Sequence, residues 1–371
     1  MSGASALGLR QVAHFDCPGG GQVVVDGTVA YIAHMKHPHG TSVVDVRDPA
    51  SPRLLATLEV PPGTHSHKVR AGNGLMLVNR EGHGADASQG AGGLLVFDIS
   101  EPARPRELAF WRCGGTGVHR FTFDGRYAYI SPELDGYVGN IVMILDLADP
   151  TRPEEVGRWW MPGQWTGGGE TPTWSGRQHR CHHPIRLDDR LYVSYWHGGF
   201  VILDVSDLAR PQLVSGLDWS PPFITPTHTA LPVPFPIQGR RVLVVADEDV
   251  AKLAPGPPSF LWLVDITDER HPTPFASFQV EGVDGEPQPE FTGCHQPSER
   301  VTGTEIPVAW FAHGLRIVDI ACPHAPREVA HFLPPVPEGS SRVSSNDVCV
   351  DDRGLLYLID RGRGLHILER V

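Results

Sequence analysis

The stretch "FVILDVSDLARP" at residues 200–211 decides the fold. Its apolar run is too short for a helix and rich in branched residues, which is typical of a buried strand. Asp204 ends this run, and a strand-ending Asp commonly accepts hydrogen bonds from the turn amides that follow. Pro211 then blocks continuation, and a second strand-like run, "QLVSGLDW", follows at residues 212–219. We therefore interpret Asp204 as part of the architecture and not as a catalytic group.

The same pattern recurs along the whole chain. Other copies place an acidic residue at the equivalent position, and these residues are Asp45, Asp98, Asp146, Asp265, Asp319 and, in a degraded last copy, Glu369. Successive acidic residues lie 48 to 61 residues apart, which is close to the length of a propeller blade. The sequence therefore predicts seven repeats.

Each repeat contains four short strand-like runs, such as "HRFTF" at 119–123 and "YAYIS" at 127–131 in addition to the two above. Seven units of four antiparallel strands predict an all-β, seven-bladed β-propeller that occupies residues 1–371 as a single domain. The repeats run roughly over residues 12–53, 54–105, 106–153, 154–211, 212–272, 273–326 and 327–371. Because the last repeat stops at its third strand, we expect residues 10–17, "RQVAHFDC", to supply its outermost strand and close the ring.

This repeated strand resembles the LVIVD-repeat family, and the resemblance covers essentially the entire chain. The resemblance implies a propeller. It implies little about chemistry, because a fold does not determine a function.

Charge and composition exclude several classes of partner. The chain has 31 Lys and Arg against 43 Asp and Glu, a formal charge of -12, so nucleic acids and anionic membranes are repelled on average. No window reaches the roughly 18 apolar residues of a membrane span, and the N-terminus lacks a leader pattern. The six Cys form no CxxC pair, which fits a reducing compartment. We expect a cytoplasmic protein without nucleic-acid or membrane partners; homo-oligomerisation stays open.

Histidines recur at one position of the repeat. Counting back eight residues from Leu75, Tyr127 and Leu191, at the second strands of three blades, gives three of them, and two more begin the innermost strands of blades five and six. The five residues are His67, His119, His183, His228 and His295. If the strand register is shifted, His65 would take the place of His67, and His182 would take the place of His183.

The propeller symmetry points these imidazoles towards one axis, so the sequence predicts a metal site there. Neutral imidazole binds Fe(II), Zn, Mn and Cu, and we expect one divalent ion, with Fe(II) favoured. Three or four of the five histidines are expected to be ligands, and the others to touch the substrate. This arrangement is similar to the carotenoid-cleavage oxygenases, in which four His hold Fe(II) with Glu behind them, and to selenium-binding-protein-type methanethiol oxidases. That similarity implies oxygen chemistry.

Polar and aromatic residues are expected on the same face of the ring. The candidates for orienting histidines or transferring protons are Glu81, Glu133, Glu248 and Asp347, although each loop Glu could equally be a solvated surface carboxylate. The candidates for substrate binding are Arg80, Trp165, Trp174, Trp196, His197, His313 and Arg361. Aromatic residues at a channel mouth favour an apolar or aromatic small molecule, and an Arg would hold a carboxylate or phenolate.

Three classes of function remain. The first is a metal-dependent oxygenase or oxidoreductase of the non-haem Fe(II) type that acts on a small organic molecule. The second is a redox-neutral hydrolase, lyase or isomerase that uses a metal and a Glu or Asp base. The third is a non-catalytic propeller that binds protein partners.

Overall fold

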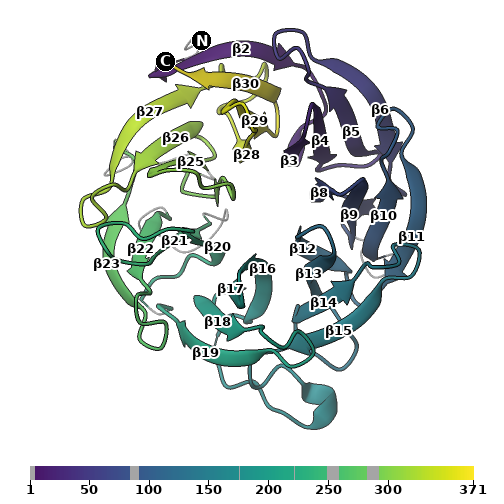
Figure 1. Cartoon of the computed structure of the whole chain (residues 1–371), viewed down its shortest axis with the longest axis vertical. Coiled ribbons are helices and arrows are strands. Elements are labelled where there is room, and N and C mark those ends of the chain that lie inside the picture. The colour runs from purple at the N-terminus through teal and green to yellow at the C-terminus, as the bar shows by residue number, and fades with distance from the viewer. Residues whose placement is uncertain (1–4, 84–91, 175, 221, 249–258, 282–291) are drawn as a thin grey trace.

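The computed structural model shows seven antiparallel sheets arranged as blades around one axis (Figure 1). It describes residues 5–83, 92–174, 176–220, 222–248, 259–281 and 292–371. In these ranges the only helical element is a 3-10 turn, η2 (Thr166–Gly168), so no described helix is long enough to cross a membrane. The prediction of an all-β, seven-bladed propeller is confirmed.

Each blade runs along the chain from its innermost to its outermost strand. Blade one consists of β3 (Gly20–Asp26), β4 (Val29–His34), β5 (His39–Asp45) and β6 (Arg53–Glu59). Blade two consists of β7 (Thr64–His65), β8 (Val69–Gly72), β9 (Leu75–Gly82), β10 (Gly93–Asp98) and β11 (Arg106–Arg112), with both β7 and β8 paired to β9. Blade three consists of β12 (Val118–Phe123), β13 (Tyr127–Pro132), β14 (Val142–Asp146) and β15 (Glu154–Trp159).

The next three blades repeat this order. Blade four consists of β16 (Arg180–Leu187), β17 (Arg190–Trp196), β18 (Phe200–Asp204) and β19 (Gln212–Leu217). Blade five consists of β20 (Thr227–Pro232), β21 (Val242–Asp247), β22 (Leu261–Asp265) and β23 (Thr273–Phe278). Blade six consists of β24 (Gln296–Pro297), β25 (Glu305–Ala309), β26 (Leu315–Asp319) and β27 (Arg327–Leu333).

The two ends of the chain meet in blade seven and close the ring (Figure 1). This blade consists of β28 (Ser345–Val350), β29 (Leu356–Asp360), β30 (Gly364–Arg370) and β2 (Leu9–Phe15). β2 pairs antiparallel with β30, as predicted. A short strand that the sequence did not indicate, β1 (Ser5–Leu7), pairs with β27 as a fifth strand of blade six.

Each blade ends one strand later in the chain than the corresponding predicted repeat. The repeat 106–153, for example, begins with β11, but β11 pairs with β10 and is therefore the outermost strand of blade two. The chain turns back at the acidic residue after the third strand, and the strand that follows lies on the outer edge of the same blade.

The recurring pattern of the repeats has a structural cause in the turn and the core. The side chains of Asp45, Asp98, Asp146 and Asp204 each accept a hydrogen bond, at 2.8 to 2.9 Å, from the amide two residues on. The apolar runs before these residues are buried on both sides because each blade packs against its neighbours. These Asp residues are architectural, as predicted.

Candidate functional site

The innermost strands surround a cavity of about 150 Å³ at one end of the axis. Six of its lining residues are histidines, from blades two to six. The complete lining consists of Met35, His65, His67, Lys68, His119, Arg180, His182, Trp196, His228, Glu248, His295, Asn346 and Arg361. Met35 and Trp196 are the only apolar residue types among these described residues, although carbon atoms, including those of the imidazole rings, make up more of the exposed wall than nitrogen and oxygen atoms do.

Five histidines form a continuous arc along this wall. The ring centroids of His67 and His119 lie 5.2 Å apart, and those of His119 and His182 lie 4.8 Å apart. The arc continues from His182 to His228 at 4.4 Å and from His228 to His295 at 4.1 Å. The structure thus brings together four of the five predicted histidines from four different blades.

The fifth predicted residue, His183, does not line the cavity, and His182 takes its place. In blade four, the residue that pairs with Asp204 at the start of the second strand is Arg190. The prediction counted from Leu191 and was therefore shifted by one residue. A shift of one residue turns a strand side chain to the other face, so the expectation for His183 was wrong.

His183 instead lies one layer deeper. Its Nε2 atom is 3.2 Å from Glu299 Oε1, and its Nδ1 atom is 3.2 Å from the Thr229 hydroxyl oxygen. Glu299 also pairs with Arg70 and lies 3.6 Å from Arg120, which is buried. The charged network around Glu299 is therefore separate from the histidine arc.

Blade one contributes no histidine because there is no room for one. Gly21 occupies the equivalent position, and a Cβ atom there would lie 2.5 Å from the His67 carbonyl oxygen and 2.7 Å from His67 Cβ. Blade seven contributes Asn346, whose backbone carbonyl accepts a hydrogen bond from His295 Nδ1. The arc of histidines is therefore limited to blades two to six.

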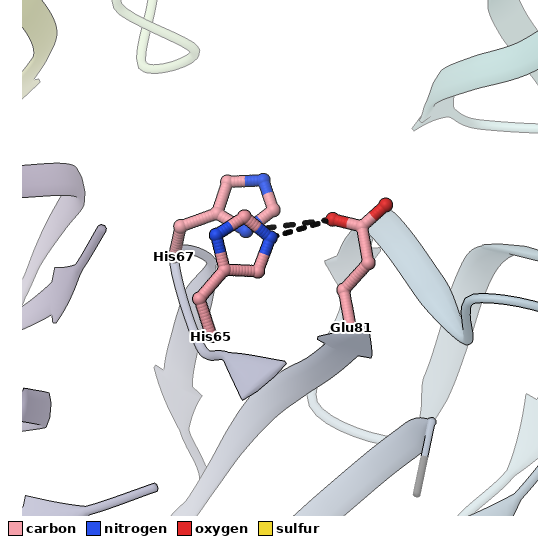
Figure 2. Close-up of side chains that lie close together, drawn as sticks. All are labelled: His65, His67 and Glu81. Atoms are coloured by element: carbon pink, nitrogen blue, oxygen red, sulfur yellow. Dashed lines mark hydrogen bonds and ion pairs between the residues drawn. The ribbon is translucent and has the colours of Figure 1, made fainter. Parts of the chain in front are cut away.

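Glu81 lies beside three of the histidines, two of which, His65 and His67, are drawn in Figure 2. Its carboxylate accepts hydrogen bonds from His65 Nε2 at 3.0 Å and from His119 Nδ1 at 2.9 Å, and lies 3.7 Å from His67 Nδ1. Burial alone would raise the pKa of Glu81, but His119 and His65 outweigh it and hold the pKa well below its usual range. Glu81 is therefore ionised and must act as the acceptor.

Hydrogen bonds at Nδ1 determine the tautomers of four histidines. His119 Nδ1 donates to the Glu81 carboxylate, His182 Nδ1 donates at 2.7 Å to the carbonyl of His228, and His295 Nδ1 donates to a carbonyl. His228 Nδ1 lies 2.8 Å from the Thr229 hydroxyl, whose own hydrogen is donated to Gln296, so Nδ1 is again the donor. The neutral form of each ring therefore carries its lone pair on Nε2.

These Nε2 atoms converge on one region of the cavity. His119 Nε2 and His182 Nε2 lie only 3.0 Å apart. His228 Nε2 and His295 Nε2 lie 3.9 and 3.7 Å from the Glu248 carboxylate. Burial, the largest cause, lowers the pKa of His119 to about 4 and those of His182 and His228 well below the usual value. Burial thus favours the neutral form of these rings, and the lone pairs on Nε2 of His119 and His182 face each other.

His67 and His65 are held differently. His67 Nδ1 lies 3.3 Å from the side-chain nitrogen of Asn79, which donates, so the neutral ring of His67 carries its hydrogen on Nε2. The contact of this ring with Glu81 is made by the other nitrogen, Nδ1 (Figure 2). Both nitrogens of His65 face oxygen atoms, Glu81 at 3.0 Å and the Met35 carbonyl at 3.4 Å. Neither ring offers the cavity a lone pair.

Of the predicted carboxylates, Glu81 and Glu248 belong to this site, whereas Glu133 and Asp347 do not. Glu133 accepts a hydrogen bond from the Thr116 amide at 2.6 Å, away from the cavity. Asp347 follows the ring position of blade seven, so it lies one layer deeper, where it accepts the Val23 amide at 3.1 Å. It lines a second cavity of about 300 Å³ on that side. Burial raises its pKa to about 6.

Only two of the predicted substrate-binding residues line the cavity, namely Trp196 and Arg361. Arg80 follows the alternation of β9 away from Glu81 and packs over Phe110 at 4.6 Å. His197 adopts a turn conformation with φ of 57°, and His313 contacts the Thr292 hydroxyl at 2.8 Å. Arg80, His197 and His313 were expected at the mouth of the histidine site, but none of them lines the cavity.

The two loop tryptophans also lie outside the cavity. Trp165 is 41% exposed and stacks on Tyr137, and Trp174 stacks on His179 with centroids 4.9 Å apart. These contacts organise the long loop between β15 and β16. The loop does not add an aromatic wall to the cavity, so the predicted aromatic cap was wrong for these two residues.

Two cationic residues of the wall, Lys68 and Arg180, were missed. Lys68 follows His67 in the gap between β7 and β8 and is 3% exposed. Arg180 begins β16 and places its guanidinium over Trp196 at 4.8 Å. The correct register of blade four, with His182 at the ring, would have placed Arg180 at the cavity mouth.

Comparisons with known proteins define the class of this propeller. The model of the LVIVD repeat matches residues 20–59, 88–109, 122–160 and 188–218. The chain is thus a seven-bladed β-propeller that carries LVIVD repeats. No curated protein sequence matches it.

Among solved structures, the chain is similar to U3-55K, with 10% identity, a TM-score of 0.63 and 98% of each chain covered. It is similar to the WD40 repeats of RRP9, with 11% identity, a TM-score of 0.62, and 97% of this chain and 96% of that chain covered. It is also similar to Sqt1 from Saccharomyces cerevisiae, with 10% identity, a TM-score of 0.55, and 95% of this chain and 86% of that chain covered. Identities this low show a shared fold alone.

Proposed function

We propose that the histidine arc binds one divalent transition-metal ion and that the protein is a metal-dependent enzyme acting on a small molecule. The observation that carries this proposal is the set of four anchored rings, His119, His182, His228 and His295. Each donates its Nδ1 hydrogen to a fixed acceptor and presents an Nε2 lone pair. Metal-binding histidines characteristically have such an acceptor behind the ring.

The distances fit a shared ion better than direct contacts between the side chains. Two nitrogen atoms that both bear lone pairs repel each other at the 3.0 Å that separates His119 and His182. The separations of 3.7 to 3.9 Å around Glu248 exceed a normal hydrogen bond. Ligand atoms bound to one ion at about 2.0–2.2 Å lie about 3–4 Å apart, so a cation would relieve both arrangements.

Fe(II) is the favoured ion. His182, His228 and Glu248 have ligand atoms within 4.8 Å of one another, a two-His, one-carboxylate group. Such a group with open positions is characteristic of non-haem Fe(II) oxygenases, in which the metal supplies one-electron and dioxygen chemistry. We therefore propose an oxygenase or oxidoreductase, with Zn, Mn and Cu as the alternative ions.

The chain's own residues have distinct roles in this proposal. Glu81 fixes the ring of His119, and the His228 carbonyl fixes the ring of His182. His67 directs Nε2–H towards a bound molecule. The three basic side chains of the lining, Lys68, Arg180 and Arg361, favour an anionic group on that molecule, in addition to the apolar or aromatic part expected from the sequence.

A redox-neutral reaction is the second candidate, and Glu248 favours it. Burial is the largest cause that raises the pKa of Glu248. A carboxyl group with a raised pKa next to a metal can exchange protons with a substrate. In that case the ion would polarise a carbonyl or activate water.

Anaerobic titration with Fe(II), followed by oxygen-uptake measurements with small organic molecules, tests the two candidates. The first predicts one tightly bound Fe(II) per chain and substrate-dependent oxygen uptake that is lost in Glu248→Ala. One bound ion without oxygen uptake for any substrate, together with turnover by the Zn form, would favour the redox-neutral reaction. Absence of stoichiometric binding of Fe(II), Zn, Mn or Cu would contradict both.

A further inference from the structure

The cavity beside the histidine arc concentrates positive charge that the metal proposal does not use. Lys68, Arg180 and Arg361 line it from blades two, four and seven. Two carboxylates, Glu81 and Glu248, lie in or behind the same wall. Three basic side chains and two carboxylates therefore meet in one small buried space.

Two of these cations lack carboxylate partners. Within the described part of the chain, the Lys68 side chain makes no hydrogen bond and has no carboxylate within 4.0 Å, although the residue is 3% exposed. Arg180 makes one side-chain hydrogen bond, from Nη1 to Asn140 Oδ1 at 3.3 Å. Among the described residues, no carboxylate lies within 4.0 Å of its guanidinium. A buried cation without an ionic partner is costly, so a site of this kind is completed by an anion.

The two arginines are held rigidly. The Arg180 guanidinium stacks over Trp196, whose ring packs 4.8 Å from His182. The Arg361 guanidinium stacks over Phe311 at 5.2 Å, and its Nε donates to Asn346 Oδ1 at 2.6 Å. Stacking fixes the plane of each guanidinium, and a guanidinium of fixed plane is suited to bind a planar oxyanion lying in the same plane.

We propose that this cavity binds a small organic carboxylate, held by Arg180, Arg361 and Lys68 next to the ion. This inference rests on the proposed function, because it names the substrate class of that enzyme. A volume of about 150 Å³ corresponds to roughly five to eight non-hydrogen atoms at ~20–30 Å³ each. That size fits a two- to five-carbon acid whose carboxylate pairs with these basic side chains while its other end faces the histidine arc.

Isothermal titration of the Zn-loaded protein, which is redox-silent, tests this inference. The probes are acetate, propanoate and pyruvate, with acetamide and propanamide as neutral molecules of matched shape. We expect acetate and propanoate each to bind at least about tenfold more tightly than the corresponding amide, because charge-assisted hydrogen bonds are the stronger ones. Equal affinity for acids and amides, or no binding of any acid at millimolar concentration, would overturn the inference.

Variants identify which cations are responsible. Arg180→Gln and Arg361→Gln are each expected to weaken propanoate binding about tenfold or more while Zn content stays at one ion per chain. Arg80→Gln is the matched control, because Arg80 is a partly buried, stacked arginine outside the cavity, and its affinity should equal that of the wild type. An equal loss in Arg80→Gln, or unchanged affinity in both cavity variants, would overturn the assignment.

Two further measurements separate the two proposals. Tighter binding of inorganic phosphate than of every acid would overturn the carboxylate class. If the protein binds no metal, the proposed enzyme fails, but the same titrations on the metal-free protein still test the anion site. If the metal binds and the acids do not, the anion inference alone fails.

Discussion

At the scale of single residues, the acceptors behind the rings determine what the cavity offers. His119 and His67 are neighbours on the arc, yet Glu81 makes Nδ1 of His119 a donor and Asn79 makes Nδ1 of His67 an acceptor. The two rings therefore present opposite groups to the cavity, a lone pair from His119 and an N–H from His67. One carboxylate and one amide thus divide a row of similar residues into ligands and hydrogen-bond donors.

Removing Glu81 should weaken metal binding without abolishing the fold. In Glu81→Ala, His119 loses the acceptor that fixes its tautomer, and loss of such an acceptor typically costs 10- to 100-fold in metal affinity. Competition with a chromophoric chelator measures this affinity. Glu133→Ala is the control, because Glu133 contacts the Thr116 amide outside the cavity and its removal should leave the affinity unchanged. Equal affinities for the wild type and Glu81→Ala would contradict the role of Glu81.

The sequence predicted the positions of four ring histidines but not the orientation of their nitrogens. The position follows from the repeat, because the strand-ending Asp sets the register of each second strand. In blade four the predicted register was wrong by one residue. The second strand begins at the charged residue Arg190, whereas the prediction took Leu191 as its start because the second strands of the other two blades begin with Leu75 and Tyr127. The tautomers depend on hydrogen-bond partners such as Asn79 and Thr229. The repeat pattern does not reveal that these residues lie next to the histidines.

At the scale of elements, the strand that closes the ring joins the two ends of the chain. β2 pairs along its whole length with β30, and Leu9 is buried in the core between blades six and seven. Phe15 and Ala13 pack on the core between blades seven and one. The sequence predicted this strand because the last repeat stops at its third strand. It did not indicate β1, which is three residues long and exposed.

Deleting residues 1–15 should destabilise the protein far more than deleting residues 1–7. The longer deletion removes β2 and exposes the edge of β30 together with the apolar surface that Leu9, Ala13 and Phe15 cover. Burial of such side chains contributes about 1.5–3 kcal/mol each, so we expect the melting temperature to fall by at least ~5 °C.

The shorter deletion is the matched control, because it removes β1 and leaves the pairing of β2 with β30 intact. Differential scanning calorimetry measures both variants, and size-exclusion chromatography reports association through the open edge. Equal melting temperatures for the two deletions would show that β2 does not close the ring.

At the scale of the whole molecule, the propeller stacks two layers of polar side chains along its axis. The ring positions supply the histidines, and the residue that follows the ring position in three of the blades supplies a second, buried layer that consists of Arg120, His183 and Asp347. The symmetry was predictable from the repeat, since equivalent residues of seven blades must meet at the axis. The contacts of the deeper layer were not predictable from the repeat. Its residues Arg120 and His183 lie close to Glu299, which also pairs with Arg70, and neither Glu299 nor Arg70 occupies the ring position of its blade.

Buried neutral histidines outside the arc should make the protein sensitive to acid. Burial lowers the pKa of His34 to about 4 and that of His366 to about 3, and both residues are 1% exposed. Between these values and about 6.5, the unfolded chain binds protons that the folded chain does not, so the free energy of unfolding decreases as the pH falls. Each residue is expected to contribute a loss of about 1–3 kcal/mol between pH 7 and pH 4.

Urea denaturation between pH 7.5 and 4.5 measures this dependence. The double variant His34→Gln, His366→Gln should have a shallower decrease than the wild type, even if it is less stable at pH 7.5. His271→Gln, a substitution of an exposed histidine paired with Asp268, should leave the slope unchanged. A double variant with the wild-type slope would show that these two residues do not control the acid response.

The central claim is that histidines from separate blades bind one metal ion and that His182, not His183, is the ligand from blade four. Elemental analysis of the purified protein and of His182→Ala and His183→Ala tests it most directly, because the two substitutions are chemically identical and adjacent in the chain. The account predicts one transition-metal ion per chain in the wild type and in His183→Ala, and loss of most of it in His182→Ala. Metal retained in His182→Ala, or lost only in His183→Ala, would contradict it.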